Sequence, residues 1–209
     1  RGRIAAKGAD HDGIGVLDGH QAAPAPAWPT LRARPRHAGA GPAFRNPPMP
    51  ESSCRTDSLR PLAIAVLTVS DTRGEAEDVS GRTLVERLEA AGHRLAEKAI
   101  CRDDVYAIRA IVSRWIADPA VQVVISTGGT GVTGRDGTPE AVQVLLDKEI
   151  SGFGELFRML SWEEIRTSTI QSRALAGVAN GTYLFVLPGS SGACRTAWDR
   201  ILKDQLDYR

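Results

Sequence analysis

Short apolar runs recur along the chain from residue 62 onward and predict buried β-strands. The clearest runs are 62–69 (LAIAVLTV), 121–127 (VQVVIST) and 182–187 (TYLFVL), with a weaker run at 93–101. These runs are short and rich in β-branched residues. In the clearest runs most positions are apolar, whereas a strand buried on one face would be apolar only at alternate positions. Continuous apolar character of this kind is typical of strands that are buried on both faces, as in a parallel sheet.

An amphipathic segment follows the first run and predicts a helix over residues 81–91. Ser80 is placed to cap its amino end, and Gly92 is placed to end it. The apolar positions that we expect to face the sheet are Leu84, Val85 and Leu88.

A second amphipathic helix is predicted between the weaker run and the run at 121–127. Either Asp103 or Asp104 can cap it, and Asp118-Pro119 stops it. Its expected apolar side consists of Tyr106, Ile108, Ile111, Val112, Trp115 and Ile116.

Three further helices are predicted in the second half of the chain. Thr138-Pro139-Glu140 is a helix start, with the cap at Thr138 and proline at the first helical position. Another helix covers about 152–165, and the stretch PGSSGACRTAW turns from the last strand into a carboxyl-terminal helix. The helix at 152–165 can be core or interface, and it collects Phe153, Leu156, Phe157, Leu160 and Trp162.

Strands that alternate with helices predict an α/β fold, in which right-handed crossovers connect parallel strands. Ligands of such sheets bind at the carboxyl ends of the strands. Three polar or glycine-rich loops leave from those ends, at 70–81, 127–138 and 188–192. We therefore expect the functional site where these loops meet.

Composition and cysteine spacing narrow the class of protein. The chain has 209 residues, of which 42% are hydrophobic and 24% charged, as in globular proteins. No apolar run approaches the roughly 18 residues of a membrane span, and no signal-peptide pattern is present. Three widely spaced cysteines do not suggest a disulfide framework or a zinc site, so a cytoplasmic location is expected.

The first 48 residues differ from the rest and suggest an appendage. They hold seven Pro and seven Gly, and seven Lys or Arg against three Asp or Glu, a net charge of +4 that leaves −3 for the remainder. Such a segment buries too little apolar surface to offset the entropy of ordering it. We expect a non-native or disordered extension over 1–58, with natural translation from Met49, and a domain over 59–209. A basic arm or transit segment is the alternative, and a nucleic-acid-binding core is not expected.

The stretch STGGTGVTGRDGTPEAV contains a match to G-x-G-x-x-G at residues 129–134. A dinucleotide-binding loop should open directly into a helix and should be followed by an acidic residue about 20 positions later. Here Arg135-Asp136-Gly137 intervenes before the helix, and the later region is ISGFGELF. NAD is therefore disfavoured, and the P-loop signature is absent as well.

The same loop can still serve phosphate chemistry. Successive glycines let backbone N–H groups surround an anion, and Thr127, Thr130 and Thr133 add hydroxyl groups. Asp136 is a possible ligand for a Mg²⁺ ion that bridges phosphates. An aspartate that caps a turn before Gly137 is the equally weighted structural alternative.

Four long stretches resemble the MoaB/MogA family of molybdenum-cofactor biosynthesis proteins, and within it bacterial MoaB most. They are LTVSDTRGEAEDVSG, STGGTGVTGRDGTPEAV, GFGELFRMLSWEEIRTSTIQSRALAGVANGT and LPGSSGACRTAW, in that order. The resemblance covers most of residues 62–201 and implies a three-layer α/β/α fold with a mostly parallel sheet. It implies the transfer of AMP from Mg-ATP to molybdopterin, which yields adenylylated molybdopterin and pyrophosphate, followed by a metal-insertion partner protein.

The resemblance also implies site residues. Asp136 and Asp103 match the family's catalytic and metal-binding aspartates, although the adjacent Asp104 leaves the register open by one residue. The remaining matches are expected to bind substrates: Ser70, Asp71, Gly81, Thr127, Gly128, Gly129, Thr130, Gly131, Pro188, Gly189, Ser190 and Ser191.

Three further expectations concern residues and assembly. Cys194 is expected to be a packed side chain instead of a reactive thiol, and His93 a surface turn residue instead of a catalyst. The resemblance implies a homo-trimer or a hexamer. A catalytically weak molybdopterin-binding paralogue is the alternative to an active adenylyltransferase.

Overall fold

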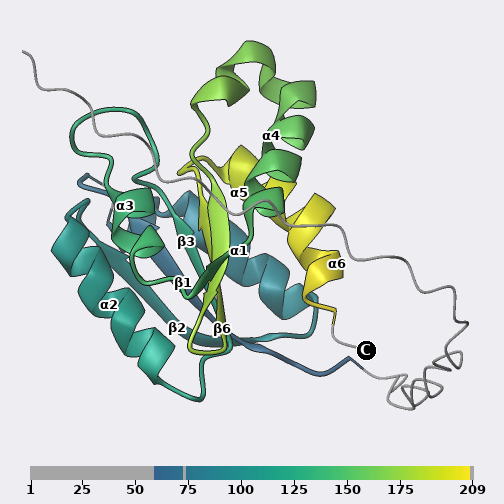
Figure 1. Cartoon of the computed structure of the whole chain (residues 1–209). Helices are drawn as coiled ribbons and strands as arrows, with labels where there is room; N and C mark the ends of the chain where they lie inside the picture. Colours follow the sequence, from purple (N-terminus) through teal and green to yellow (C-terminus); the bar gives the residue numbers. More distant parts are fainter. Residues whose placement is uncertain (1–58, 73, 208–209) are drawn as a thin grey trace, which may run out of the picture. The chain divides into compact units, whose positions relative to one another are not determined.

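A six-stranded sheet with helices on both faces forms the centre of the protein (Figure 1). The computed structural model describes residues 59–72 and 74–207, so the expectations for residues 1–58 and for a start at Met49 lie outside the described residues. The strand order is β2-β1-β3-β6-β5-β4. Four strands are mutually parallel, namely β1 (Ala63–Val69), β2 (Arg94–Cys101), β3 (Val123–Thr127) and β6 (Thr182–Leu187). The predicted α/β fold with a mostly parallel sheet is confirmed.

The two remaining strands, β5 (Leu175–Ala179) and β4 (Lys148–Glu149), were not predicted. β5 pairs antiparallel with β6, and β4 pairs antiparallel with β5 at the edge. A two-residue turn joins β5 to β6, with Asn180 at φ +47° and Gly181 at φ +80°. Asn-Gly is the preferred pair for a hairpin turn in which both residues have positive φ. The hairpin signal was therefore present in the sequence.

Helices cover the sheet from both sides. The α-helices are α1 (Val79–Ala90), α2 (Val105–Ala117), α3 (Thr138–Gln143), α4 (Ser151–Ile165), α5 (Ser191–Ala197) and α6 (Lys203–Gln205). Short segments join them: the 3₁₀ turns η1 (Glu75–Glu77) and η2 (Arg166–Gln171), and the π-helical stretch η3 (Trp198–Leu202) between α5 and α6. Figure 1 shows α2 and α3 on one face of the sheet, and α1, α5 and α6 on the other.

The alternation of side chains along each strand produces two hydrophobic cores. In β1, Ile64 and Val66 pack toward α1, α4 and α5, whereas Ala65 and Leu67 pack toward α2 and α3. All seven residues of β1 are buried. The continuous apolar runs therefore arise because both faces of the central strands lie under helices.

The start of α1 differs from the prediction. The helix begins at Val79, and the buried carboxylate of Asp78 caps it by accepting the Gly81 N–H at 2.8 Å. Ser80 lies inside the helix, and its hydroxyl donates to the Gly189 carbonyl oxygen at 2.8 Å. The Asp78 Oδ2 also forms an ion pair with the Lys98 Nζ at 2.9 Å and accepts a hydrogen bond from the Thr68 hydroxyl at 3.0 Å. A buried carboxylate needs such partners, which the sequence pattern does not reveal.

Three other local expectations were wrong. Thr138 is the first residue of α3 and not its cap, and its hydroxyl is buried without a hydrogen-bond partner among the described residues. Tyr106 points outward from α2 and is 76% exposed. His93 is buried, its Nδ1 accepts the Leu62 N–H at 3.2 Å, and its ring meets Trp198 edge to face.

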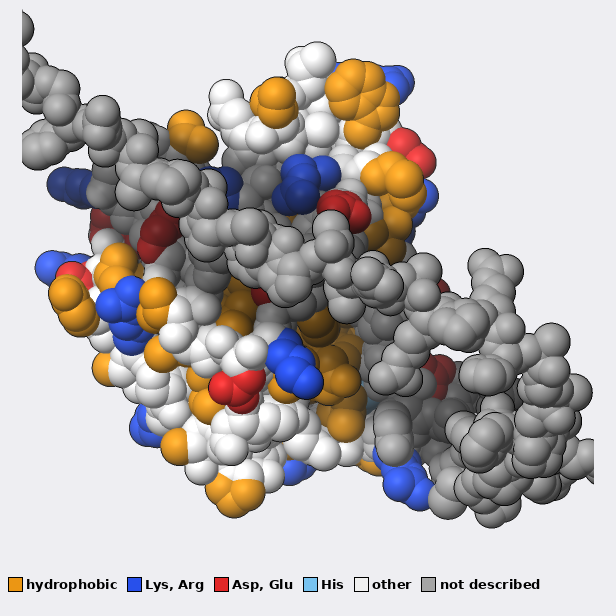
Figure 2. All heavy atoms as spheres, in the orientation of Figure 1, with side chains coloured by type: hydrophobic (Ala, Val, Ile, Leu, Met, Phe, Trp, Pro, Cys, Tyr) orange, Lys and Arg blue, Asp and Glu red, His pale blue; other side chains and the backbone are white. Residues whose placement is uncertain are grey.

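Helix α4 and the segment after it project beyond the carboxyl ends of the parallel strands (Figure 1). Phe153, Phe157 and Leu160 face the core, whereas exposed apolar side chains gather over the outer side of α4 (Figure 2). The large ones on this outer side are Leu156, Met159, Trp162 and Ile165. Within residues 59–72 and 74–207, none of the helices combines the length and the apolar character that a membrane span requires.

Candidate active site

The strand order creates a crevice at the carboxyl ends of the central strands. From β1 the chain continues to β2 at one edge of the sheet, whereas from β3 it continues to β4 at the other edge. Ligands of doubly wound sheets bind at the point where the strand order reverses in this way. The loops 70–78, 128–137 and 188–190 all start from strands at this point.

Close backbone contacts join these loops. Gly128 has a φ of +104°, and a Cβ atom there would lie 2.1 Å from the Val69 carbonyl oxygen. Its N–H donates to the Leu187 carbonyl oxygen at 3.0 Å. A Cβ atom on Gly189 would lie 3.1 Å from the Gly128 Cα. Both the positive φ and the missing side chain at Gly128 are needed for the three loops to meet.

Asp103 faces the glycine loop and Asp104 does not. The Asp103 Oδ1 accepts the Gly137 N–H at 3.1 Å, and a Cβ atom on Gly129 would lie 2.6 Å from its Oδ2. Asp104 instead caps α2 by accepting the backbone N–H groups of Tyr106 and Ala107. Of the two candidates, Asp103 is therefore the one beside the loop.

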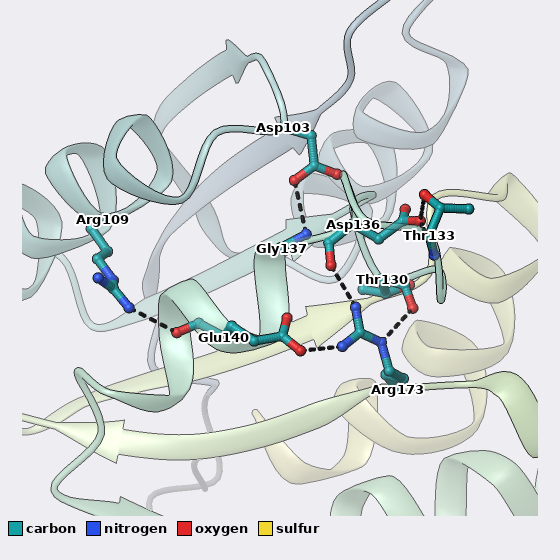
Figure 3. Close-up of polar contacts among 8 residues, drawn as sticks. All are labelled: Asp103, Arg109, Thr130, Thr133, Asp136, Gly137, Glu140 and Arg173. Atoms are coloured by element: carbon teal, nitrogen blue, oxygen red, sulfur yellow. Dashed lines mark hydrogen bonds and ion pairs between the residues drawn. The ribbon is translucent and has the colours of Figure 1, made fainter. Parts of the chain in front are cut away.

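Asp136 lies on the other side of the same loop. Its Oδ2 accepts the Thr133 N–H at 2.9 Å, and the Thr133 hydroxyl donates to the same oxygen (Figure 3). These bonds form the turn that the sequence suggested as an alternative to a metal ligand. Hydrogen bonds from the Thr133 side chain and from the Thr133 and Gly131 backbone hold the pKa of the Asp136 carboxyl below its ordinary value.

The site concentrates negative charge. Burial raises the pKa of the Asp103 carboxyl, the Gly137 N–H opposes this, and the charges of Asp136 and Asp71 raise the pKa further. Asp71 is tied in from the first loop, since its Oδ1 accepts the Asp103 N–H at 3.1 Å and its Oδ2 pairs with Arg135. Clustered carboxylates of this kind favour a bound cation.

A divalent cation fits this donor set only with help from a ligand. No group of three or more His, Cys, Asp or Glu side chains that could hold a metal by itself occurs in the described part of the chain. Mg²⁺ commonly binds through one or two carboxylates together with substrate phosphates and water. Asp103 and Asp136 fit that mode, because they flank a loop whose backbone N–H groups can face phosphates.

Arg173, which was not predicted as a site residue, forms hydrogen bonds to the glycine loop near both of its ends. Its Nε donates to the Thr130 carbonyl oxygen at 3.2 Å and its Nη2 to the Asp136 carbonyl oxygen at 2.7 Å. It also forms an ion pair with Glu140 of α3 (Figure 3). Arg173 lies two residues before β5, so its role depends on the antiparallel edge of the sheet that was not predicted.

The other expected site residues divide into two groups. One group lies in the three loops: Ser70 and Asp71 in the first, Gly128, Gly129, Thr130 and Gly131 in the glycine loop, and Pro188, Gly189 and Ser190 in the third, with Ser191 starting α5. Thr127 is buried beneath them and donates to the Pro188 carbonyl oxygen at 3.0 Å. Gly81 lies inside α1, where a Cβ atom would meet Asp78 at 2.2 Å, so its role is in packing.

Cys194 is a packed side chain, as expected. It is fully buried under the third loop, and its sulfur lies 3.3 Å from the Thr127 hydroxyl. Burial raises the pKa of the Cys194 thiol to about 11. A thiol with so little thiolate at neutral pH is a poor nucleophile.

Comparison with known proteins identifies the family. Residues 65–208 match the family described as "Probable molybdopterin binding domain". The chain belongs to the MoaB/MogA family of molybdenum-cofactor biosynthesis proteins.

The matches to relatives within the family extend over most of each relative's length. The chain is similar to "Molybdenum cofactor biosynthesis protein B" of Escherichia coli (strain K12), with 58% identity over 149 residues, 71% of this chain and 88% of that protein. It is also similar to the protein of the same name from Bacillus cereus, with 46% identity over 144 residues, 68% of this chain and 85% of that protein.

Solved structures of the family have the same fold. A crystal structure of "Molybdenum cofactor biosynthesis protein B" matches with a TM-score of 0.69 and 44% identity, covering 71% of this chain and 93% of that chain. The "tungsten cofactor synthesizing protein MoaB from Pyrococcus furiosus" matches with a TM-score of 0.65 and 36% identity, covering 71% and 94%. The three-layer α/β/α arrangement expected from the resemblance is confirmed.

Proposed function

We propose that this protein adenylylates molybdopterin, using Mg-ATP and releasing pyrophosphate. The observation that carries the proposal is the convergence of Asp103 and Asp136 on a glycine loop at the reversal point of the sheet. Family membership supports the pathway, and the donor set supports phosphate chemistry. The finer assignment of substrates and reaction is our proposal.

The reaction needs positioning and charge neutralisation more than covalent participation of the protein. An oxygen of the terminal phosphate of molybdopterin attacks the α-phosphorus of ATP and forms a new P–O bond. The bond from that phosphorus to the oxygen bridging it to the β-phosphate breaks, and pyrophosphate leaves with the electron pair. The attacking phosphate is already anionic at neutral pH, so a strong general base is unnecessary.

The chain's own groups suit these tasks. Backbone N–H groups of Gly129 and Thr130 and of the third loop are placed to orient phosphates, and Asp103 and Asp136 would hold Mg²⁺. When bound, Mg²⁺ would neutralise charge that develops on the leaving pyrophosphate. Arg173 keeps the loop in place by holding the carbonyl oxygens of Thr130 and Asp136.

Pyrophosphate release from molybdopterin and ATP tests the proposal. Asp103→Asn and Asp136→Asn should each lower the rate by at least about 100-fold, because each removes a charge that holds the cation. Asp104→Asn is the matched control, since asparagine also caps helices and the side chain points away from the loop. Full activity of Asp136→Asn, or equal loss in all three variants, would refute the assigned roles.

A molybdopterin carrier without turnover is the second candidate. It is favoured by one observation, the hydrogen bonds from Thr133 that already engage the Asp136 carboxylate in a turn. Molybdopterin that binds tightly but yields no pyrophosphate with ATP and Mg²⁺ would select this function over the first.

We also propose that the protein forms a homo-trimer or hexamer and delivers its product to a molybdenum-insertion protein. Support comes from the exposed apolar side of α4, where Met159 is 63% and Trp162 47% exposed. Large exposed apolar patches commonly mark protein interfaces. Light scattering that gives a monomer at micromolar concentration would refute the oligomer.

A further inference from the structure

A cavity adjoins the glycine loop at Thr130 and Gly131. Its volume is about 270 Å³, and it lies between the loop, α4, η2 and the start of α5. Thr130, Gly131 and Ser190 line the end nearest the candidate active site, whereas Phe157, Ser161 and Glu164 line the part under α4. The cavity is therefore continuous with the phosphate-binding loops.

The cavity is lined mainly by polar side chains, with one aromatic residue beneath them. Phe157 is almost fully buried, and the hydroxyl of Ser172, another lining residue, is buried without a hydrogen-bond partner in the described part of the chain. Polar groups placed on a cavity wall fix the orientation of a bound ligand.

Among the residues that the structure describes, Glu164 is the only acidic side chain that lines this cavity. Its Oε1 accepts the hydroxyl of the buried Thr196 at 2.9 Å, which fixes the carboxylate against α5. Within residues 59–72 and 74–207, its Oε2 accepts no hydrogen bond and Glu164 forms no ion pair. The neighbouring Glu163, by contrast, forms an ion pair with Arg200 and does not line the cavity.

We infer that Glu164 recognises the 2-amino-4-oxopyrimidine edge of a pterin whose phosphate lies at the glycine loop. This inference rests on the proposed substrate. The pterin edge presents a ring N–H and an amino group side by side, and a carboxylate can accept both in a paired, charge-assisted arrangement. Adenine lacks two adjacent donors on one edge, so the same carboxylate would select the pterin over the nucleotide base.

The spacing along α5 is consistent with this orientation. Thr196, which holds Glu164, lies six residues after Ser190 at the start of the helix. The helical rise separates the two by about 9 Å. The carboxylate is thus far enough from the phosphate end to avoid strong repulsion, and a pterin that carries a phosphate on its 6-substituent is long enough to reach both.

Binding of 6-hydroxymethylpterin monophosphate, followed by pterin fluorescence, tests the inference. Glu164→Gln should weaken binding about tenfold or more, because one acceptor becomes a donor that faces a ligand donor. Glutamine keeps an oxygen for Thr196, so the fold should be unaffected. Glu163→Gln is the matched control and should bind like the unaltered protein.

A second ligand, which differs from the first only at the 2-amino group, tests whether the pyrimidine edge of the pterin is what Glu164 recognises. The corresponding lumazine phosphate has a carbonyl oxygen in place of the 2-amino group and should bind the unaltered protein more weakly, with a smaller change in Glu164→Gln. Equal binding of the pterin phosphate by Glu164→Gln and the unaltered protein would overturn the inference. Tighter binding of GMP, which carries the same edge on a guanine, would overturn it as well.

The result of this binding test does not depend on whether the protein adenylylates molybdopterin. Pterin phosphate binding that depends on Glu164, in a protein that releases no pyrophosphate, would support this inference and refute the proposed catalysis. Glu164→Gln that weakens ATP binding and leaves pterin phosphate binding unchanged would assign the cavity to the nucleotide and overturn the inference.

Discussion

Replacing Arg173 with methionine should release the glycine loop from both of its anchors. The guanidinium donates to the carbonyl oxygens of Thr130, near the start of the loop, and Asp136, near its end. Methionine keeps much of the apolar stem and removes every donor. The substitution therefore tests the hydrogen bonds separately from the packing of the side chain.

The size of the effect follows from these contacts. Hydrogen bonds to a charged group each contribute about 1.5–3 kcal/mol, but the Arg173 side chain is 29% exposed and water can partly replace its donors. We take the lower end and expect a local loss of about 2–3 kcal/mol, or a roughly 30- to 140-fold increase in the equilibrium for loop opening. The ion pair with Glu140, which is partly exposed, adds little.

Amide hydrogen exchange of residues 131–136 measures this opening directly. Arg109→Met is the matched control, because Arg109 donates to the carbonyl oxygens of Glu140 and Ala141 in α3 instead of to the loop. Unchanged exchange at 131–136 in Arg173→Met, or equal acceleration in Arg109→Met, would show that the loop does not depend on Arg173. Arg173→Lys should be intermediate, since one ammonium group cannot reproduce the planar fork.

Three further substitutions test the local structure through the free energy of unfolding in urea. Arg166→Gly should raise it by about 1 kcal/mol, because Arg166 has a φ of +53° and a ψ of −131°, a conformation that favours glycine. Gly81→Ala should lower it by about 1–3 kcal/mol, because the new Cβ atom would lie 2.2 Å from the Asp78 carboxylate. Glu97→Gln should lower it by about 1 kcal/mol at pH 7, a modest value because the Glu97 side chain is 40% exposed. Hydrogen bonds from Arg114 and then from the Trp115 indole lower the pKa of Glu97 from 4.5 to about 2. A lowered pKa stabilises the fold above the unfolded-state value, so the difference between Glu97→Gln and the unaltered protein should shrink as the pH falls from about 4.5 toward 2.

Each of these substitutions has its own control. Arg166→Ala removes the side chain but keeps the unfavourable φ, so a gain equal to that of glycine would rule out backbone strain as the cause. Gly152→Ala, in the first turn of α4, meets no atom within 4 Å and should leave stability unchanged or slightly raised. A difference for Glu97→Gln that stays constant between pH 7 and pH 2.5 would contradict the pKa assignment.

The sequence predicted the parallel part of the sheet well because its signal is local. The strands that end at Val69, Thr127 and Leu187 are buried on both faces, so hydrophobicity alone marks them. The loops that follow them carry the glycines and aspartates, and the topology of an α/β sheet brings those loops together. The location of the candidate site could therefore be predicted from the hydrophobic pattern and the topology of the sheet.

The features that were missed depend on contacts between distant segments. Asp78 caps α1 instead of Ser80 because Lys98 and Thr68 satisfy its buried carboxylate, and Lys98 lies on another strand. Arg173 lies in a polar stretch with no periodicity, and only the fold brings it to residues 130 and 136. The burial of His93 depends on the Leu62 N–H and the Trp198 ring. Propensity arguments contain no information about such partners.

The Asn180-Gly181 hairpin has a consequence for the order in which the chain folds. It brings β5 and β6 together over a two-residue loop, whereas β1 pairs with β2 and β3, and β3 with β6, across helices or longer stretches of chain. Hairpins close in about 1–10 μs, and pairings between distant strands form much more slowly because loop closure costs entropy before any contact repays it. The hairpin can thus form first and serve as a template. Strand β3 then pairs with the β6 edge of the hairpin, and β1 and β2 complete the sheet. Because Arg173 lies two residues before β5, a strand of this hairpin, the anchor of the glycine loop would be among the earliest parts of the site to take its place.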